Sequence, residues 1–462
     1  MTTYFNHPPR SISDELHHIA TILMTPGHGI LITDESLYQL EKQLEVFGIS
    51  RGEATRIQYR NMLFSTGEKM ADYVSGVAVH PEVLDLTTSS GCALHCQLRR
   101  KNILVGVTVG RGLVPLMCTV GEFTTQGLDG LGGNCTEYKD SGCDFTMWRA
   151  QYNIGEFTPS YQAIIENGNT LAKYAAISQS KRMLAILEVD IIPSDDNDLD
   201  RAEKVAETVL MFIYKALYDH HVDLQGTLLK LPVLHSGPKC DKRYSPGQIS
   251  KATLRMLRQV VPPAVGGIIL QVDGKTEDKT LCQLNAFAVD PSPKPWPITF
   301  SFDGGSQSSI CIAWGGHKKN IERAQNELLK ILGAFSQAVL GKYAAGSMKS
   351  LADQCYCKKA LRYFKTRPTP LPDDCVKYDE ICRPPTAQSM AAKPEQHGQP
   401  TESPTEIEEE ANYPPPAEDL ITENRREQPD PPNEPPTEVK EEEAEANGPL
   451  SAEGLITEHT EE

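Results

Sequence analysis

The chain of 462 residues contains no apolar run of about 18 residues, the length that a helix needs to cross a membrane. Its N-terminal segment, MTTYFNHPPRSISDEL, also lacks the apolar stretch of a secretory leader. No two of its 12 cysteines are separated by two residues, so their spacing does not match that of a zinc module. These absences predict a cytoplasmic protein with reduced thiols, no membrane association and no bound metal.

An excess of basic residues is lacking as well. Residues 1–385 carry 41 acidic and 41 basic side chains, whereas residues 386–462 carry 21 acidic and 4 basic ones. The net charge of −17 therefore belongs to the C-terminal segment. Because a neutral body has no surplus of positive charge for a phosphate backbone, we do not expect nucleic acid as a partner.

Eight short apolar runs are present in the body of the chain. Their Val, Ile and Leu residues are continuous instead of alternating, which is typical of strands covered on both faces. Amphipathic stretches lie between runs, as at 54–64, 200–221 and 321–332. This alternation predicts a (β/α)8 barrel over residues 1–370, followed by a connector at 371–385. The runs are GILITDE (29–35), VSGVAVH (74–80), LVGVTV (104–109), DFTMWR (144–149), MLAILEVD (183–190), LQGTLLKL (224–231), VGGIILQV (265–272) and PITFSFD (297–303).

The segment 386–462 is predicted to be a disordered acidic tail. It holds 12 prolines and one aromatic residue, so it cannot bury enough apolar surface to offset chain entropy. It also contains a duplicated motif: PTEIEEEAN and AEDLITEN (404–412 and 417–424) return as PTEVKEEEAEAN and AEGLITEH (436–447 and 452–459). The tail either only solubilises the chain or carries two copies of a short motif that binds a protein partner bivalently.

A barrel carries its chemistry at the carboxyl ends of its strands. Asp34, Arg149, Glu188 and Lys230 stand at these ends. Lys230 follows GTLL and precedes Leu231, and an apolar setting lowers a lysine pKa, so the neutral amine could form a Schiff base with a carbonyl compound. Asp34 and Glu188 would then move protons to and from the intermediates. The alternative is that Lys230 is an ion-paired structural lysine.

The chain resembles class I fructose-bisphosphate aldolase, the Schiff-base aldolase of glycolysis, over about residues 12–345. The resemblance implies that Lys230 forms the imine with dihydroxyacetone phosphate, that Glu188 is the acid/base, and that Asp34 and Arg149 complete the catalytic set. It also implies a sugar phosphate substrate, a homotetramer and no cofactor or metal. The motifs that carry it are PGHGILITDES (26–36), GEFTTQGLDGL (121–131), YKALYDHHVDLQGTLLK (214–230), VPPAVGG (261–267), KPWPITFSF (294–302) and AWGG (313–316).

Several substrate-binding positions depart from the family pattern. Met147 replaces a catalytic lysine and Thr108 replaces a substrate-facing one. Gln43 and Gly304 stand where the family has arginines that bind the sugar phosphates. A Ser-Gly-Gly turn after the seventh run reads Val272-Asp273-Gly274, and Asp303 adds a further carboxylate beside the phosphate site. Phosphate prefers arginine and backbone amides, and an aspartate repels it.

Three hypotheses follow from these residues. The favoured one is an aldolase-like protein that keeps the imine lysine but cleaves fructose 1,6-bisphosphate weakly or not at all. A second is an inactive scaffold, a pseudoenzyme that acts as a structural or binding protein through its tail. A third is an active aldolase with an altered carbonyl substrate.

Overall fold

The computed structural model describes residues 8–88, 91–272 and 276–354. All of them belong to the first of the two units, 1–390 and 391–462, into which the chain divides. The predicted connector at 371–385 and the predicted acidic tail at 386–462, with its duplicated motif, lie outside the described residues.

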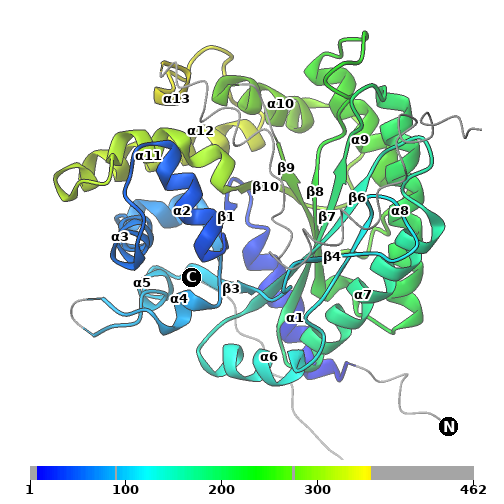
Figure 1. Ribbon diagram of the computed structural model, residues 1–462, viewed down its shortest axis with the longest axis horizontal. Helices are drawn as coiled ribbons and strands as arrows, with labels where there is room; N and C mark the ends of the chain where they lie inside the picture. The colour runs from blue at the N-terminus through cyan, green and yellow to red at the C-terminus, as the bar shows by residue number, and fades with distance from the viewer. Residues whose placement is uncertain (1–7, 89–90, 273–275, 355–462) are drawn as a thin grey trace, which may run out of the picture. The chain divides into compact units, whose positions relative to one another are not determined.

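Eight parallel strands close into a barrel in the order β1-β10-β9-β8-β7-β6-β3-β2 (Figure 1), which confirms the predicted fold class. Each of the eight apolar runs overlaps one of these strands. The strand bounds are β1 Gly29–Thr33, β2 Val74–Val79, β3 Leu104–Thr108, β6 Phe145–Asn153, β7 Leu184–Ile192, β8 Thr227–Pro232, β9 Gly267–Gln271 and β10 Ile298–Phe302.

Helices surround the barrel and connect its strands. The amphipathic stretches at 54–64, 200–221 and 321–332 overlap α3 (Glu53–Phe64), α8 (Leu199–Asp219) and α12 (Ile321–Val339). The short 3-10 helices within the described residues are η2 Glu68–Asp72, η3 Leu224–Gly226, η4 Gly304–Gln307 and η5 Lys318–Asn320. The α-helices are α1 Arg10–Leu23, α2 Leu37–Val46, α3 Glu53–Phe64, α4 Glu82–Asp85, α5 Cys96–Arg99, α6 Leu131–Asp140, α7 Tyr161–Ser180, α8 Leu199–Asp219, α9 Pro246–Val260, α10 Glu277–Val289, α11 Ser308–Trp314, α12 Ile321–Val339 and α13 Leu351–Gln354.

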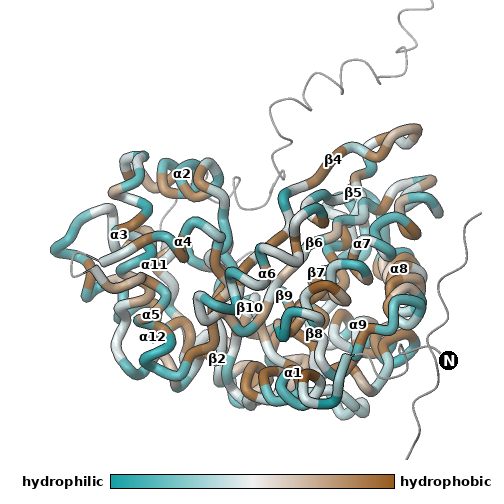
Figure 2. Tube along the Cα trace, turned by 90° about the horizontal axis from the view of Figure 1, so that it is seen from below, coloured by the Kyte–Doolittle hydropathy of each residue, from teal (hydrophilic) through white to brown (hydrophobic). Residues whose placement is uncertain are grey.

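Local sequence accounts for where α8 and α9 begin. The Asp198 side chain accepts a hydrogen bond from the Arg201 amide at the start of α8. Ser245 and Gln248 form a capping box at the start of α9, where Pro246 occupies the first helical turn. Such caps satisfy amide groups that have no partner within the helix. Figure 2 shows hydrophobic and hydrophilic residues alternating along the outer helices, as expected of helices with one face on the strands.

The structure also contains a small antiparallel hairpin that the sequence did not predict. It consists of β4 Leu113–Pro115 and β5 Phe123–Thr125 and lies outside the barrel sheet. Trp148 of β6 donates from its indole nitrogen to the Thr125 hydroxyl at 2.9 Å. The hairpin thus packs beside β6, one of the strands that carry candidate residues.

Candidate active site

Strand register brings the central candidate residues into one row. Arg149 of β6 is aligned with Glu188 of β7, and Glu188 is aligned with Lys230 of β8. Residues aligned across neighbouring strands point to the same face of a sheet. The Lys230 amine donates to Glu188 Oε1 at 2.7 Å and to Gln271 Oε1 of β9 at 3.0 Å. Lys230 is 1% exposed, so its amine lies inside the barrel between β7 and β9.

A third strand places a carboxylate beside the same amine. Asp303 follows β10, and its Oδ2 is 3.5 Å from Lys230 Nζ. The lysine was expected in an apolar setting with a lowered pKa, and this expectation is wrong. Burial does lower the pKa of Lys230, but the charges of Asp303, Glu188 and Asp34 outweigh it and hold the pKa above its usual value. The amine is therefore an ammonium at neutral pH and must give up a proton before it can act as a nucleophile.

Asp34 and Thr108 lie together at the mouth of the barrel. The Thr108 hydroxyl donates to Asp34 Oδ2 at 2.8 Å. Thr108 is aligned with Met147 on the neighbouring strand, so two positions that lack the expected lysines stand side by side. Asp34 is thus held by a neutral hydroxyl donor.

Met147 extends the apolar interior of the barrel toward this site. Its side chain is fully buried and belongs to a cluster that includes Phe145 and Ile186. Two residues further along β6, Arg149 forms an ion pair with Asp190 of β7. The cation predicted as catalytic is therefore paired with a carboxylate near Glu188, and position 147 supplies only apolar contact.

The two positions that lack arginine are in direct contact. The Gln43 amide donates to the Gly304 carbonyl oxygen at 3.2 Å. A Cβ atom at Gly304 would stand 2.1 Å from Glu35 Oε1, so a buried carboxylate fills the space where a longer residue 304 would begin. Val272, at the end of β9, is 4% exposed, whereas Asp273 and Gly274 lie outside the described residues. Among the described positions, this part of the site therefore presents amide, apolar and acidic groups.

Sequence reasoning missed three contributions to the site. Gln271 was not singled out, although a glutamine that ends the apolar strand GIILQ was a usable signal. Asp303 was assigned only to the phosphate region, because the closing of β10 against the other strands is not visible in a linear pattern. Glu35 was not considered, since its approach to Gly304 depends on the loop after β1.

The chain is similar to known proteins in sequence and in structure. A family model for class I fructose-bisphosphate aldolase matches residues 15–363. The chain belongs to the class I fructose-bisphosphate aldolase family. It is 46% identical over 347 residues to fructose-bisphosphate aldolase of Drosophila melanogaster, covering 75% of this chain and 96% of the relative. It is 42% identical over 341 residues to the Schistosoma mansoni aldolase, covering 74% and 94% of the two chains.

A solved structure of a family member has the same fold. Fructose-bisphosphate aldolase of Plasmodium falciparum, solved with TRAP and a small-molecule inhibitor, superimposes with a TM-score of 0.70 at 33% sequence identity. The match covers 73% of this chain and 97% of that one. The family assignment therefore rests on sequence and structure together, and it covers the barrel but not the tail.

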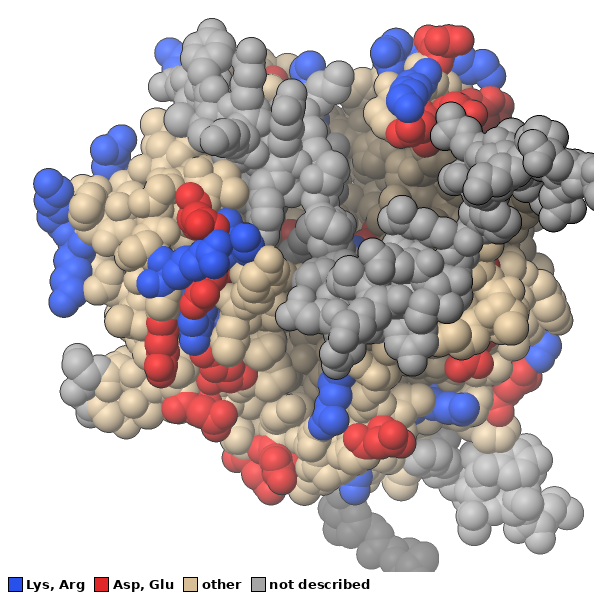
Figure 3. All heavy atoms as spheres, in the orientation of Figure 1, with Lys and Arg blue, Asp and Glu red and all other residues tan. Residues whose placement is uncertain are grey.

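Further features of the described residues concern the cysteines, groups that could bind a metal, membrane-spanning helices and surface charge. The cysteines at positions 92, 96, 118, 135, 143, 240, 282 and 311 are free. Within the described ranges, no group of three or more His, Cys, Asp or Glu side chains is arranged to hold a metal ion, and no helix is long and apolar enough to cross a membrane. On the face of the molecule in Figure 3, acidic and basic side chains both lie around the rim.

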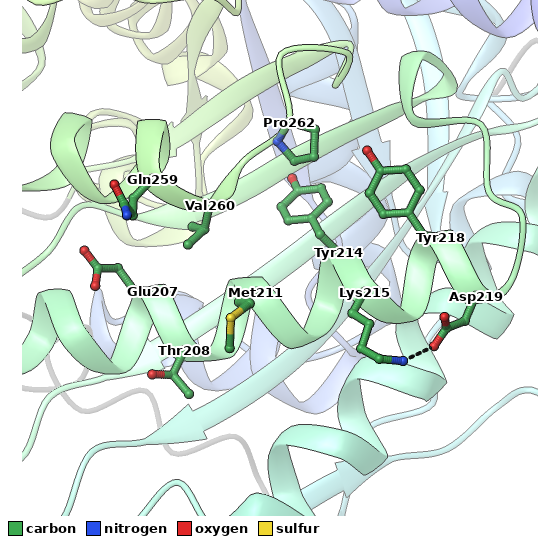
Figure 4. Close-up of a pocket in the computed structure, with 10 residues that line it drawn as sticks. All are labelled: Glu207, Thr208, Met211, Tyr214, Lys215, Tyr218, Asp219, Gln259, Val260 and Pro262. Atoms are coloured by element: carbon green, nitrogen blue, oxygen red, sulfur yellow. Dashed lines mark hydrogen bonds and ion pairs between the residues drawn. The ribbon is translucent and has the colours of Figure 1, made fainter.

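A separate hollow of about 640 Å³ lies on the outside of the barrel between α8 and the end of α9 (Figure 4). Its one charged contact in the close-up joins Lys215 to Asp219, four residues apart on α8. Its lining residues are Glu207, Thr208, Met211, Tyr214, Lys215, Tyr218, Asp219, Gln259, Val260 and Pro262. Unlike the surroundings of Lys230, this hollow does not combine a buried amine with an acid in contact, because its Lys215–Asp219 pair is exposed.

Proposed function

We propose that Lys230 forms a Schiff base with a carbonyl compound and that Glu188 and Asp34 transfer protons during this reaction. The contact of 2.7 Å between Lys230 Nζ and Glu188 Oε1, buried at the carboxyl end of the barrel, carries the proposal. Glu188 takes a proton from the ammonium, and the neutral amine adds to the carbonyl carbon. Return of a proton to the carbinolamine oxygen releases water and leaves the imine.

We further propose that cleavage of fructose 1,6-bisphosphate is weak or absent. The support is the loss of positive charge at Met147, Thr108, Gln43 and Gly304. Loss of one preorganised electrostatic group costs about 10²–10³ in rate, and several of these positions would act on the same substrate. Met147 lies in a buried apolar cluster, and Gln43 donates to the Gly304 carbonyl oxygen. Neither contact brings a positive charge to these positions.

The remaining predicted properties follow the family and stay proposals. If the protein is active, its substrate is a sugar phosphate or a related carbonyl compound, it needs no cofactor, and it works as a homotetramer in the cytoplasm. Residues 147, 108, 43, 272, 273 and 304 form a substrate-binding region with altered chemistry. The alternative of an active aldolase with a changed carbonyl substrate involves the same altered substrate-binding region.

Borohydride trapping tests the imine directly. Full-length protein is incubated with dihydroxyacetone or dihydroxyacetone phosphate, reduced with borohydride and digested, and the peptide containing Lys230 is identified by mass spectrometry. We expect an adduct on Lys230 with at least one compound and none in Lys230→Met. Lys215→Met is the matched control, because it removes a lysine from the outer face of α8, where it pairs with Asp219. No adduct on Lys230 with either compound would contradict the proposal.

The duplicated tail motif favours a second function, that of a binding scaffold. Leu420 and Ile421 recur as Leu455 and Ile456 within otherwise acidic and polar repeats. Full-length protein and a variant with these four residues changed to Ser would be compared in pull-downs from a native extract. Partners retained equally by both proteins would exclude the motif as their binding site.

A further inference from the structure

Asp303 points into the barrel because of the alternation along β10. The rings of Phe300 and Phe302 lie 5.1 Å and 5.4 Å from the ring of Phe335 on α12, so both face outward. Alternate residues of an extended strand face opposite sides. Ser301 and Asp303 therefore face the interior, where Asp303 Oδ2 lies 3.5 Å from Lys230 Nζ.

The acceptor groups of these two residues are buried and lack donors. Asp303 is 7% exposed and Ser301 is 5% exposed. Among the described residues, neither carboxylate oxygen of Asp303 has a hydrogen-bond partner, and the Ser301 hydroxyl has none either. Buried polar groups in folded proteins are nearly always hydrogen-bonded, whereas Asp303 has the ion pair with Lys230 at 3.5 Å but no hydrogen bond among the described residues. A buried carboxylate that is ion-paired with the amine but still accepts no hydrogen bond can accept one from a ligand that brings its own donor.

The distance from the amine defines which part of a ligand meets Asp303. Once a carbonyl compound is joined to Nζ, an oxygen on the carbon next to the imine carbon lies roughly 3 to 4 Å from that nitrogen, from ordinary bond lengths. This is the range in which Asp303 Oδ2 is found. Glu188 approaches the amine from β7, and Gln271 approaches from β9. A substituent directed toward β9 and β10 thus comes into contact with Asp303.

The charge around the amine decides between two kinds of substituent. Asp303, Glu188 and Asp34 act together on the single positive charge of Lys230. A phosphate monoester carries up to two negative charges and has no strong donor, so contact with Asp303 is repulsive. A hydroxyl group is neutral and can donate to the carboxylate oxygen.

We propose that Asp303 is a specificity-determining residue that accepts a hydrogen bond from a hydroxyl next to the imine carbon and excludes phosphate from that position. The substrate class is then a short neutral hydroxyketone, joined to Lys230 with loss of one water molecule. This inference rests on the proposed Schiff-base function and names its substrate.

Competition between two probes tests the inference in the full-length protein. Trapping rates on Lys230 are measured with dihydroxyacetone and with dihydroxyacetone phosphate, and their ratio is compared among wild type, Asp303→Gly and Asp303→Asn. We expect wild type to favour the unphosphorylated compound and Asp303→Gly to move the ratio toward the phosphate by about 100-fold, from the removed charge repulsion. Asp303→Asn keeps the size of the side chain and removes its charge, so it should move the ratio in the same direction. Asp219→Asn removes a carboxylate from the outer face of α8 and should leave the ratio unchanged.

Each outcome separates this inference from the proposed function. If adducts form on Lys230 but the ratio of the two trapping rates is the same in wild type and both Asp303 variants, the proposed role of Asp303 is overturned. The imine proposal then still holds. If no protein forms an adduct, the Schiff-base function fails, and calorimetry with glycerol 3-phosphate then tests Asp303 without imine formation. Binding at least about tenfold tighter in Asp303→Gly than in wild type would support charge exclusion, and equal binding would overturn it.

Discussion

At the scale of single residues, the site combines one amine with several carboxylates. Lys230 contacts Glu188 directly and has Asp303 nearby, so its positive charge is stabilised from two strands. In contrast, Met147 and Gly304 bring no charge to their positions. We propose that the site can form an imine but lacks groups that would hold a phosphorylated substrate.

The raised pKa of Lys230 has a consequence for the pH dependence of trapping. Burial opposes the charged form, but Asp303, Glu188 and Asp34 together raise the pKa. Only the neutral amine attacks a carbonyl, so the rate of adduct formation should increase as pH rises from 6 to 9. Asp303→Asn removes one of the stabilising charges and should shift this rise to lower pH. Trapping rates across the pH range check this, and identical profiles in the two proteins would contradict it.

Restoring positive charge tests whether the lost cations limit cleavage. Met147→Lys together with Gly304→Arg should raise kcat/KM for fructose 1,6-bisphosphate by about tenfold or more, since one electrostatic group commonly contributes 10²–10³. Because position 147 is buried in an apolar cluster and position 304 faces Glu35, the variant should also be less stable than wild type. Met211→Lys, at a half-exposed site on α8, is the control. Steady-state kinetics measures kcat/KM, and a parallel thermal unfolding curve measures stability. Unchanged kcat/KM in a folded variant would show that restoring charge at these two positions is not sufficient for cleavage.

At the scale of elements, the position of Asp303 depends on β10 and α12. Phe300 and Phe302 pack against Phe335, and this contact fixes which residues of β10 face the interior. The alternation on β10 therefore links core packing to the geometry of the site. The same principle places Glu188 and Lys230 side by side through the register of β7 and β8.

Removing the central ring of this contact should destabilise the barrel. Phe335 is 1% exposed, and truncation of a buried Phe to Ala costs about 3–5 kcal/mol in unfolding free energy. Leu340→Ala is the matched control just beyond α12, because Leu340 is 39% exposed and should cost much less. Denaturant unfolding of both variants measures the difference. An equal decrease in the free energy of unfolding in Phe335→Ala and Leu340→Ala would show that the ring contact does not stabilise the barrel.

The elements also show how far the sequence allowed prediction. The eight apolar runs located every barrel strand, because parallel strands buried on both faces need continuous Val, Ile and Leu. The hairpin of β4 and β5 was missed, since three-residue strands such as LVP and FTT are too short to show a period. Glu188 and Lys230, which the sequence places at the ends of neighbouring runs, are in contact in the structure. The contacts of Gln271 and Asp303 with Lys230 depend on barrel closure and on side-chain reach, which a linear pattern does not contain.

At the scale of the whole molecule, charge and family membership divide the chain in the same way. Residues 15–363 match the aldolase family, and residues 1–385 have equal numbers of acidic and basic side chains. The net charge of −17 lies in residues 386–462, beyond the family match. We therefore propose that the chemistry belongs to the barrel and that any partner binding belongs to the tail.

The most direct test of the central proposal is kcat/KM of the full-length protein for fructose 1,6-bisphosphate. The Drosophila melanogaster aldolase, 46% identical to this chain, serves as the reference under the same conditions. We predict a value at least about 100-fold below the reference, because we propose that four substrate-binding positions lack a positive charge. A value equal to that of the reference would contradict the proposed loss of bisphosphate cleavage.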